Sequence, residues 1–237
     1  MTFADGAVLD AAAVKANFEA IIRLGALAQL AGPYLAGLES IEVTGPLSVR
    51  ITFKQANAQF LQASSTMSLG LLSPATLARS ADERCQGALV GSGPFTVKSF
   101  EHNKLVRLDS RADYAWQSSL AEHQGRAWLD AIEFHILPES GVRLGSLLSG
   151  QIDVNTSVLV QDEAVLDAQG IPSIARPNPG VVFNLTPNES RPPLDQLAVR
   201  QALNKAIDRA QFKGVISRFQ KPASSVLASS TPSASSR

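Results

Sequence analysis

The side chains most often used for metal binding or nucleophilic attack are few in this sequence and widely spaced. The histidines are His102, His123 and His135, and Cys85 is the sole cysteine. A structural zinc site draws on four Cys or His ligands, usually in closely spaced pairs, and the sequence contains no such pair. We therefore predict no metal site, and a single cysteine cannot form a disulfide within the chain.

A glycine-rich run at residues 90–95, VGSGPF, could be mistaken for a phosphate-binding or catalytic loop. A phosphate loop needs Lys followed by Ser or Thr after its second glycine, and a nucleophile elbow needs G-x-S-x-G. Neither pattern is present, and no Gly-rich dinucleotide fingerprint follows a predicted strand. We interpret the run as a structural loop, and we expect a protein without a cofactor that catalyses no reaction.

Composition and charge narrow the class of protein further. The 237 residues include 21 basic and 21 acidic side chains, so the formal net charge is zero. This balance gives no attraction to nucleic acid or to an anionic membrane, and no apolar run reaches transmembrane length. The length suits one large domain or two modest ones, each with its own hydrophobic core.

The stretch at residues 129–154 shows how such a core is organised. Apolar and polar residues alternate from Ile132 to Ile136, as in a strand with one buried face, and Pro138 ends that strand. A short helix capped by Gly150 follows, and a second apolar segment begins at Ile152. This order predicts a strand–helix–strand crossover between two parallel strands.

Further elements follow from the same periodicities and from turn and capping residues. We expect, in chain order, a turn at Asp5 and Gly6, a helix after Asp10, a hairpin over 41–53 around Gly45 and Pro46, the first turns of a helix over 75–79, strands over 95–97 and 104–108, a short helix over 160–168, strands from 171 and over 181–184, and a helix within 192–212.

Four of these segments carry recognisable motifs. The motif residues are Phe3, Asp5, Gly6, Leu9, Asp10, Ala11 and Val14 in the first; residues 91–95 in the second; Pro138, Arg143, Ser149, Gly150, Ile152, Asp153 and Val154 in the third; and Pro192, Pro193, Leu194, Asp195, Val199, Arg200, Gln201, Ala202, Leu203, Ala206, Ile207, Asp208 and Arg209 in the fourth. Together they resemble the family 5 solute-binding proteins, the peptide- and nickel-type receptors of ABC importers. Ala13 and Gln151 depart from the family pattern, which has aspartate and glutamate there.

The resemblance implies an α/β fold of the type II periplasmic-binding-protein kind. It implies a lobe with a mixed sheet and an accessory α+β subdomain, truncated before the second lobe is complete. Residues 1–90 would form the accessory subdomain, 91–176 the main sheet of lobe one, and 177–220 the start of lobe two. Residues 221–237, rich in Ser and Ala, would be a poorly ordered tail. We also expect the chain to begin inside the family pattern, as part of a longer exported protein.

The resemblance also implies a function. The protein would capture a peptide or a similar small solute, such as a nickel complex, and deliver it to a membrane permease from the periplasm or the cell surface. The stretch TMSLGLLSP at residues 66–74 lacks the arginines that some metal-chelate-binding relatives carry there. The alternatives are a sensory or regulatory module with the same fold and an uncharacterised enzyme.

Candidate ligand contacts come from position in the family pattern, and each of these residues has core packing as its alternative role. They are Tyr34, Met67, Leu69, Gly70, Phe183 and Asn184.

Overall fold

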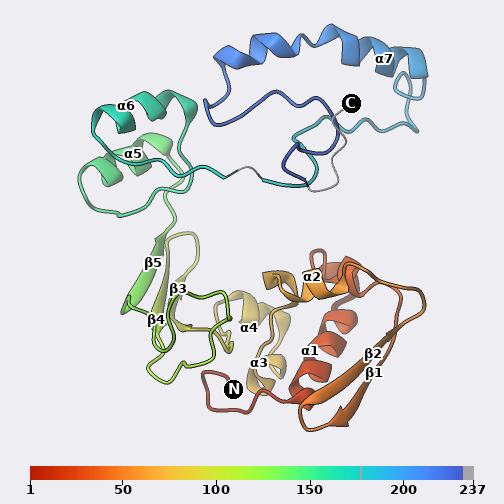
Figure 1. Ribbon diagram of the computed structural model, residues 1–237, viewed down its shortest axis with the longest axis vertical. Helices are drawn as coiled ribbons and strands as arrows, with labels where there is room; N and C mark the ends of the chain where they lie inside the picture. Colours follow the sequence, from red (N-terminus) through yellow and green to blue (C-terminus); the bar gives the residue numbers. More distant parts are fainter. Residues whose placement is uncertain (177, 232–237) are drawn as a thin grey trace. The chain divides into compact units, whose positions relative to one another are not determined.

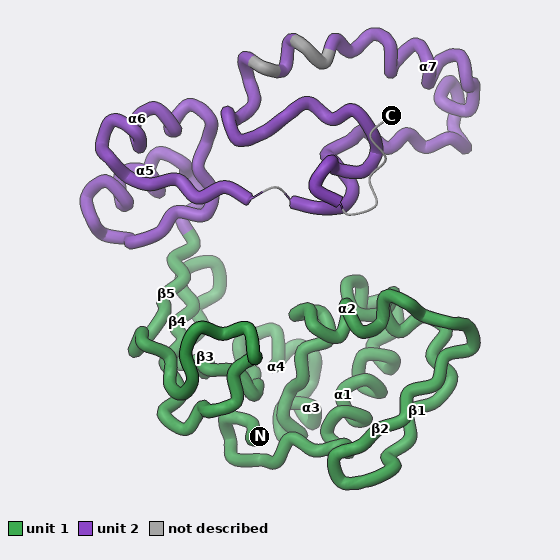
Figure 2. Tube along the Cα trace, viewed as in Figure 1, with its two compact units in different colours: residues 1–136 green, residues 137–237 purple. Residues whose placement is uncertain are grey.

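The computed structural model describes residues 1–176 and 178–231. These residues fold into two compact units, Met1–Ile136 and Leu137–Arg237 (Figure 2). The boundary therefore falls directly after the strand predicted within residues 129–154. The lobe divisions that the family pattern implies at residues 90, 176 and 220 stay predictions, and residue 177 itself lies outside the described residues.

Helix α1 (Ala11–Leu24) is the central helix of the first unit (Figure 1). Asp10 is its N-cap, as predicted, and the Asp10 carboxylate accepts a hydrogen bond from the Ala13 backbone N–H at 2.9 Å. The helix ends at Gly25, whose φ of 53° suits glycine best. The buried face includes Ala13 and Phe18, so the predicted amphipathic helix is confirmed.

A β-hairpin packs against this helix and closes the core of the first unit. Strands β1 (Leu38–Gly45) and β2 (Ser48–Phe53) pair antiparallel, as the turn residues Gly45 and Pro46 predicted. The 3-10 helices η1 (Gly25–Leu27) and η2 (Gly32–Leu35) connect α1 to the hairpin. The core consists of Phe18, Leu35, Ile41, Ala63 and Leu69.

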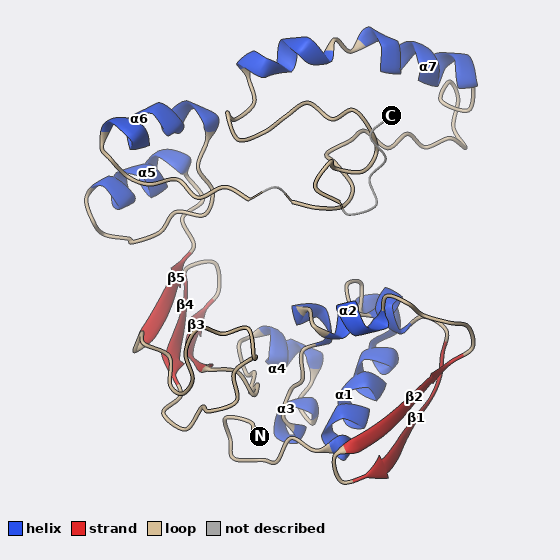
Figure 3. Ribbon diagram, viewed as in Figure 1, coloured by secondary structure: helices blue, strands red, loops and turns tan. Residues whose placement is uncertain are grey.

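Short helices follow the hairpin (Figure 3). They are α2 (Phe60–Ser64), η3 (Met67–Leu69), α3 (Pro74–Leu77) and α4 (Ala81–Cys85). Serine side chains start the last two, because Ser73 accepts from the Thr76 N–H and Ser80 forms a capping box with Glu83. The helix predicted over 75–79 is thus present, beginning at Pro74.

Asn17 joins α1 to the segment before α3 through its side chain. This residue is 3% exposed, its Nδ2 donates to the Leu72 carbonyl at 2.9 Å, and its Oδ1 accepts from the Leu72 N–H at 2.8 Å. Leu72 also forms a β-bridge with Gly91. The buried carboxamide of Asn17 therefore satisfies both backbone polar groups of Leu72.

The second sheet lies in the same unit and follows the glycine-rich run. Its strands are β3 (Phe95–Glu101), β4 (Leu105–Ser110) and β5 (Ala131–His135), in the order β3-β4-β5 with antiparallel pairing throughout. The predicted strands over 95–97, 104–108 and 132–136 are confirmed. The predicted parallel crossover after β5 is wrong, because residues 152–154 form no strand and no described strand lies beside them.

Short helices separated by irregular segments make up the second unit. The helices are α5 (Ser140–Leu148), η4 (Val160–Asp162), α6 (Glu163–Ala168), α7 (Leu197–Ala206) and η5 (Arg209–Gly214). The predicted strands from 171 and over 181–184 are wrong, since Val181 forms only an isolated bridge with Leu227. The helix predicted within 192–212 is confirmed but shorter, because the backbone at Ile207 is extended.

Arginines near the starts of α5 and α7 make the same backbone contacts. Arg143 and Arg200 each donate through Nη1 to the carbonyls six and five residues earlier in the chain. The N-cap residues Glu139 and Gln196 make no side-chain capping hydrogen bond. Each arginine therefore fixes the chain entering its helix, a role that a capping side chain often has.

Part of the C-terminal segment forms backbone hydrogen bonds with residues 180–182, and poor order of the tail stays a prediction. Residues 221–231 are described, and Val182 N–H donates to the Val226 carbonyl at 3.0 Å while Ala228 N–H donates to the Gly180 carbonyl at 2.8 Å. These bonds offset part of the ordering cost that the Ser- and Ala-rich composition suggested. Residues 232–237 of the predicted tail lie outside the described residues. Within the described chain, no helix combines the length and apolar character needed to cross a bilayer.

Candidate functional site

The predicted ligand contacts are divided between the two units. Tyr34, Met67, Leu69 and Gly70 belong to the first unit, and Phe183 and Asn184 belong to the second.

In the first unit the predicted contacts separate into buried and exposed residues. Leu69 is 3% exposed and belongs to the hydrophobic core, and Tyr34 is partly buried against that core. Both residues pack against this core, and ligand contact stays a prediction for both. Met67 is 93% exposed, and Gly70 donates its N–H to the Met67 carbonyl at 3.1 Å. Ligand contact at Met67 and Gly70 stays a prediction.

In the second unit the predicted contacts lie in an exposed loop. The Phe183 side chain is fully exposed. Asn184 Nδ2 donates to the Val182 carbonyl at 2.7 Å, and Asn184 Oδ1 accepts from the Thr186 hydroxyl at 2.8 Å. The asparagine therefore shapes the loop that presents Phe183. A role in ligand binding stays a prediction for both residues.

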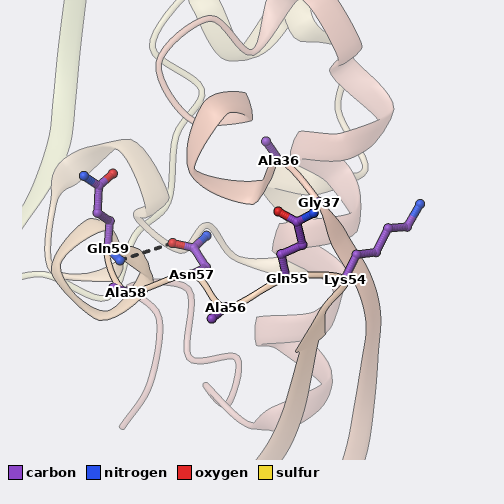
Figure 4. Close-up of a pocket in the computed structure, with 8 residues that line it drawn as sticks. All are labelled: Ala36, Gly37, Lys54, Gln55, Ala56, Asn57, Ala58 and Gln59. Carbon is purple, nitrogen blue, oxygen red and sulfur yellow. Dashed lines mark hydrogen bonds between the residues drawn. The ribbon is translucent and has the colours of Figure 1, made fainter.

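Next to Tyr34 the first unit has a surface hollow of about 480 Å³. It is lined by residues 36–37 and 54–59 and is called the carboxamide hollow below (Figure 4). Its two walls are joined where the Lys54 N–H donates to the Gly37 carbonyl at 2.9 Å.

The hollow takes its character from the sequence Q-A-N-A-Q at residues 55–59. Figure 4 shows Gln55, Asn57 and Gln59 projecting to one side of this segment and the two alanines to the other. Asn57 holds the arrangement: its Nδ2 donates to the Tyr34 carbonyl at 3.4 Å, and its Oδ1 accepts from the Gln59 N–H at 3.2 Å. The lining combines three carboxamides and one lysine with alanine and glycine, and it contains no acidic side chain.

Sequence reasoning selected Tyr34 but missed residues 54–59. The alternation of carboxamides with alanines was visible in the sequence. The signal went unused because carboxamides belong to no catalytic or metal-binding motif.

Arg111 fixes the framework around the glycine-rich run. Its side chain is buried, donates to the carbonyls of Thr2 and Phe3 at 3.2 and 3.4 Å, and pairs with Asp113 at 2.8 Å. The hydrogen bond from Arg111 lowers the pKa of the Asp113 carboxyl below its ordinary value. Trp116 packs beside Arg111 and donates its indole N–H to the Ser92 carbonyl at 2.9 Å. The loop at residues 90–95 is thus held by structural contacts, as interpreted from the sequence.

Asp5 belongs to the same framework. The Ser73 hydroxyl is the main cause that lowers the pKa of the Asp5 carboxyl, and the Ala7 N–H and the charge of Arg111 act in the same direction. The Ala7 N–H donates to Asp5 Oδ1 at 3.1 Å, which forms the predicted turn at Asp5 and Gly6. In the described part of the chain, no group of three or more His, Cys, Asp or Glu side chains is placed to hold a metal ion.

Comparison with known proteins gives a match along the whole sequence. Residues 1–237 match the family described as "Bacterial extracellular solute-binding proteins, family 5 Middle". The glutathione-binding protein GsiB of Salmonella paratyphi A is 27% identical over 227 residues, which are 95% of this chain and 42% of that protein. The probable D,D-dipeptide-binding periplasmic protein DdpA of Escherichia coli K12 is 27% identical over 222 residues, 91% of this chain and 40% of that protein.

The fold is likewise similar to solved structures. NikA from Brucella suis, crystallised with Fe(III)-EDTA, aligns with a TM-score of 0.77 and 23% identity, over 98% of this chain and 46% of that one. This likeness confirms the predicted periplasmic-binding-protein-like α/β fold. The chain spans less than half the length of each of these three proteins.

Proposed function

This chain belongs to family 5 of the bacterial extracellular solute-binding proteins, and we propose that it captures a short peptide for an ABC importer. The observation that carries the proposal is the family match over residues 1–237. The relatives are binding proteins and not enzymes, and two of them are named for glutathione and for D,D-dipeptides, which are short peptides.

Two features favour a peptide over a metal chelate. Residues 66–74 contain no arginine that could neutralise an anionic chelate. The exposed polar groups near the predicted contacts are instead carboxamides, which form hydrogen bonds with uncharged polar solutes. The likeness to NikA concerns the fold alone at 23% identity.

The relatives are more than twice as long as this chain, so the proposal concerns the whole protein. Two lobes would close on the solute, and the closed population would be selected through contacts with both lobes. The loaded protein would then deliver the solute to a membrane permease from the periplasm or the cell surface. This chain would supply one wall of the binding cleft.

Uptake by the native host tests this function. We expect deletion of the coding sequence to reduce uptake of labelled glutathione or D-alanyl-D-alanine at least about tenfold, and to leave uptake of Fe(III)-EDTA unchanged. Expression of the gene from a plasmid should restore uptake. Unchanged uptake of both peptides would contradict the transport proposal, and a change in transcription without any change in uptake would support the regulatory alternative.

Calorimetry on the 237-residue chain tests the statement that it forms one wall only. With glutathione or D-alanyl-D-alanine as titrant, we expect dissociation constants weaker than micromolar, because one side of the solute stays in water. Micromolar or tighter binding would show that this chain forms a complete site.

A further inference from the structure

We propose that the carboxamide hollow binds the peptide groups of the solute, with Gln55 and Gln59 as the recognition residues. The inference rests on the proposed function and names the part of the solute that this hollow would bind. It follows from the hydrogen-bonding capacity left over at the hollow, from the rigidity of its base and from the absence of acidic groups.

The three carboxamides differ in how much of their hydrogen-bonding capacity is used within the protein. Asn57 is engaged on both sides, by the Tyr34 carbonyl and the Gln59 N–H. The side chains of Gln55 and Gln59 have no hydrogen-bond partner among the described residues. Each carboxamide offers two N–H donors and one carbonyl acceptor, and a peptide group offers one donor and one acceptor. The two glutamines can therefore pair with both polar atoms of a peptide group.

The base of the hollow is fixed in place. The Lys54 N–H bond to Gly37 holds one end of the segment. At the other end, Phe60 packs its ring 6.2 Å from that of Phe18 and 5.1 Å from that of Phe53. A segment that is held at both ends loses little further freedom when a ligand binds, which favours recognition by weak polar contacts.

Few charged groups line the carboxamide hollow. The lining contains no carboxylate, and Lys54, its one charged residue, extends away from the three carboxamides (Figure 4). On the preceding hairpin, by contrast, Arg50 and Glu42 form an ion pair with 3.7 Å between Nη1 and Oε2. The hollow therefore suits the uncharged middle of a peptide better than either charged end.

Nuclear magnetic resonance titration of the 237-residue chain tests this proposal. The probe is N-acetylalanine N-methylamide, which has two peptide groups and no charge; its partner probe is N-acetylalanine methyl ester, in which oxygen replaces one N–H. We expect the amide to shift the backbone resonances of residues 36–37 and 54–59 with a dissociation constant in the millimolar range. The ester should bind about 2- to 10-fold more weakly, as expected for the loss of one hydrogen bond.

Three variants locate the interaction. Gln55→Ala and Gln59→Ala should each weaken amide binding about 2- to 10-fold without moving resonances outside the hollow. Gln62→Ala is the matched control, because Gln62 is exposed on α2 and does not line the hollow. Its binding should equal that of the unmodified chain.

Three outcomes would overturn the proposal: no shifts at residues 54–59, equal binding of the amide and the ester, or equal weakening by Gln62→Ala. If any of these occurred while deletion still abolished peptide uptake, the transport function would stand and recognition would lie elsewhere. Binding at the hollow with unchanged uptake would instead support this inference and contradict the transport function.

Discussion

Helices α1 and α7 have the same kind of amphipathic sequence but opposite surroundings. Helix α1 buries Phe18 at 5% exposure among the core residues of the first unit. Helix α7 buries no residue, and its apolar side chains Leu197 and Leu203 remain 59% and 52% exposed. A period of 3.6 residues therefore indicates that a helix forms, whereas burial of its apolar face depends on a partner elsewhere in the fold.

The same contrast holds for the two units as wholes. Apart from Leu166, the buried apolar residues of the described chain belong to the first unit, and so do the buried polar residues. The first unit thus has its own hydrophobic core, whereas the described side chains of the second unit are mostly exposed and include ion pairs such as Arg218 with Glu163 and Asp167. Stability should be distributed unevenly along the chain.

The largest effect that tests this contrast comes from removing one apolar side chain in each helix. Phe18→Ala should lower the free energy of unfolding of the first unit by about 3–5 kcal/mol, because it leaves a cavity in the core. Leu203→Ala should change the free energy of unfolding of the second unit by less than about 0.5 kcal/mol, as for other surface substitutions. Both tryptophans, Trp116 and Trp128, belong to the first unit. Urea titration followed by tryptophan fluorescence therefore reports on the first unit, and amide exchange in α7 reports on the second. Equal losses from the two substitutions, each measured in its own unit, would refute the contrast.

Changes to the helix caps should have a smaller effect on stability. Removing the cap of α1 should destabilise that helix, and adding a cap to α7 should stabilise it. Asp10→Ala removes the N-cap hydrogen bond of α1 and should lower the free energy of unfolding by about 0.5–2 kcal/mol. Gln196→Asp supplies α7 with a cap that it lacks, at a residue whose backbone is already extended. It should slow amide exchange in α7 about two- to fivefold. No change in exchange at α7 would show that its start is set by Arg200 alone.

Acid should have the smallest effect, and it should reach both units. The pKa values of Asp113 and Asp167 are lowered, chiefly by hydrogen bonds from Arg111 and Arg218 respectively. A carboxyl with a lowered pKa in the folded state contributes stability above its unfolded pKa of about 3.9, and this contribution is lost as the pH falls through the folded value. Carbon-13 titration should show both midpoints below about 3.9.

Arg218→Gln is the matched variant for this titration. It should return the Asp167 midpoint towards its ordinary value and leave the Asp113 midpoint unchanged, since these carboxyls interact with different arginines. A shift of both midpoints would mean that the two pairs are coupled.

Sequence reasoning succeeded where a local signal decides the structure. The Asp10 cap, the turn at Gly45 and Pro46, and Pro94 before β3 each act within a few residues, and the elements next to them form as predicted. It failed where a distant neighbour decides. The alternation at residues 132–136 fits parallel and antiparallel pairing equally, and pairing with β4 settled the choice. The apolar segment from Ile152 has no such neighbour among the described residues.

The candidate site shows the same limit. An apolar residue such as Leu69 suits a core and a ligand cleft equally, and only the packing of η3 against the core distinguishes the two. Met67, two residues earlier, is exposed in the same 3-10 turn. The sequence does not predict that turn, so the exposure of Met67 could not be inferred from it. The carboxamide alternation was readable, but its proximity to Tyr34 depends on the hairpin that separates residues 36–37 from 54–59.

The contacts of Arg111 have a consequence for the order of events during synthesis. The carbonyls of Thr2 and Phe3 accept hydrogen bonds from a residue 109 and 108 positions later, and Leu72 depends on Gly91 and Asn17 together. At about 5–20 residues per second, the ribosome takes roughly 5–20 s to add the intervening residues. Until then the backbone carbonyls of Thr2 and Phe3 stay bonded to water. The segment at Thr2 and Phe3 should therefore dock only after Arg111 has left the exit tunnel.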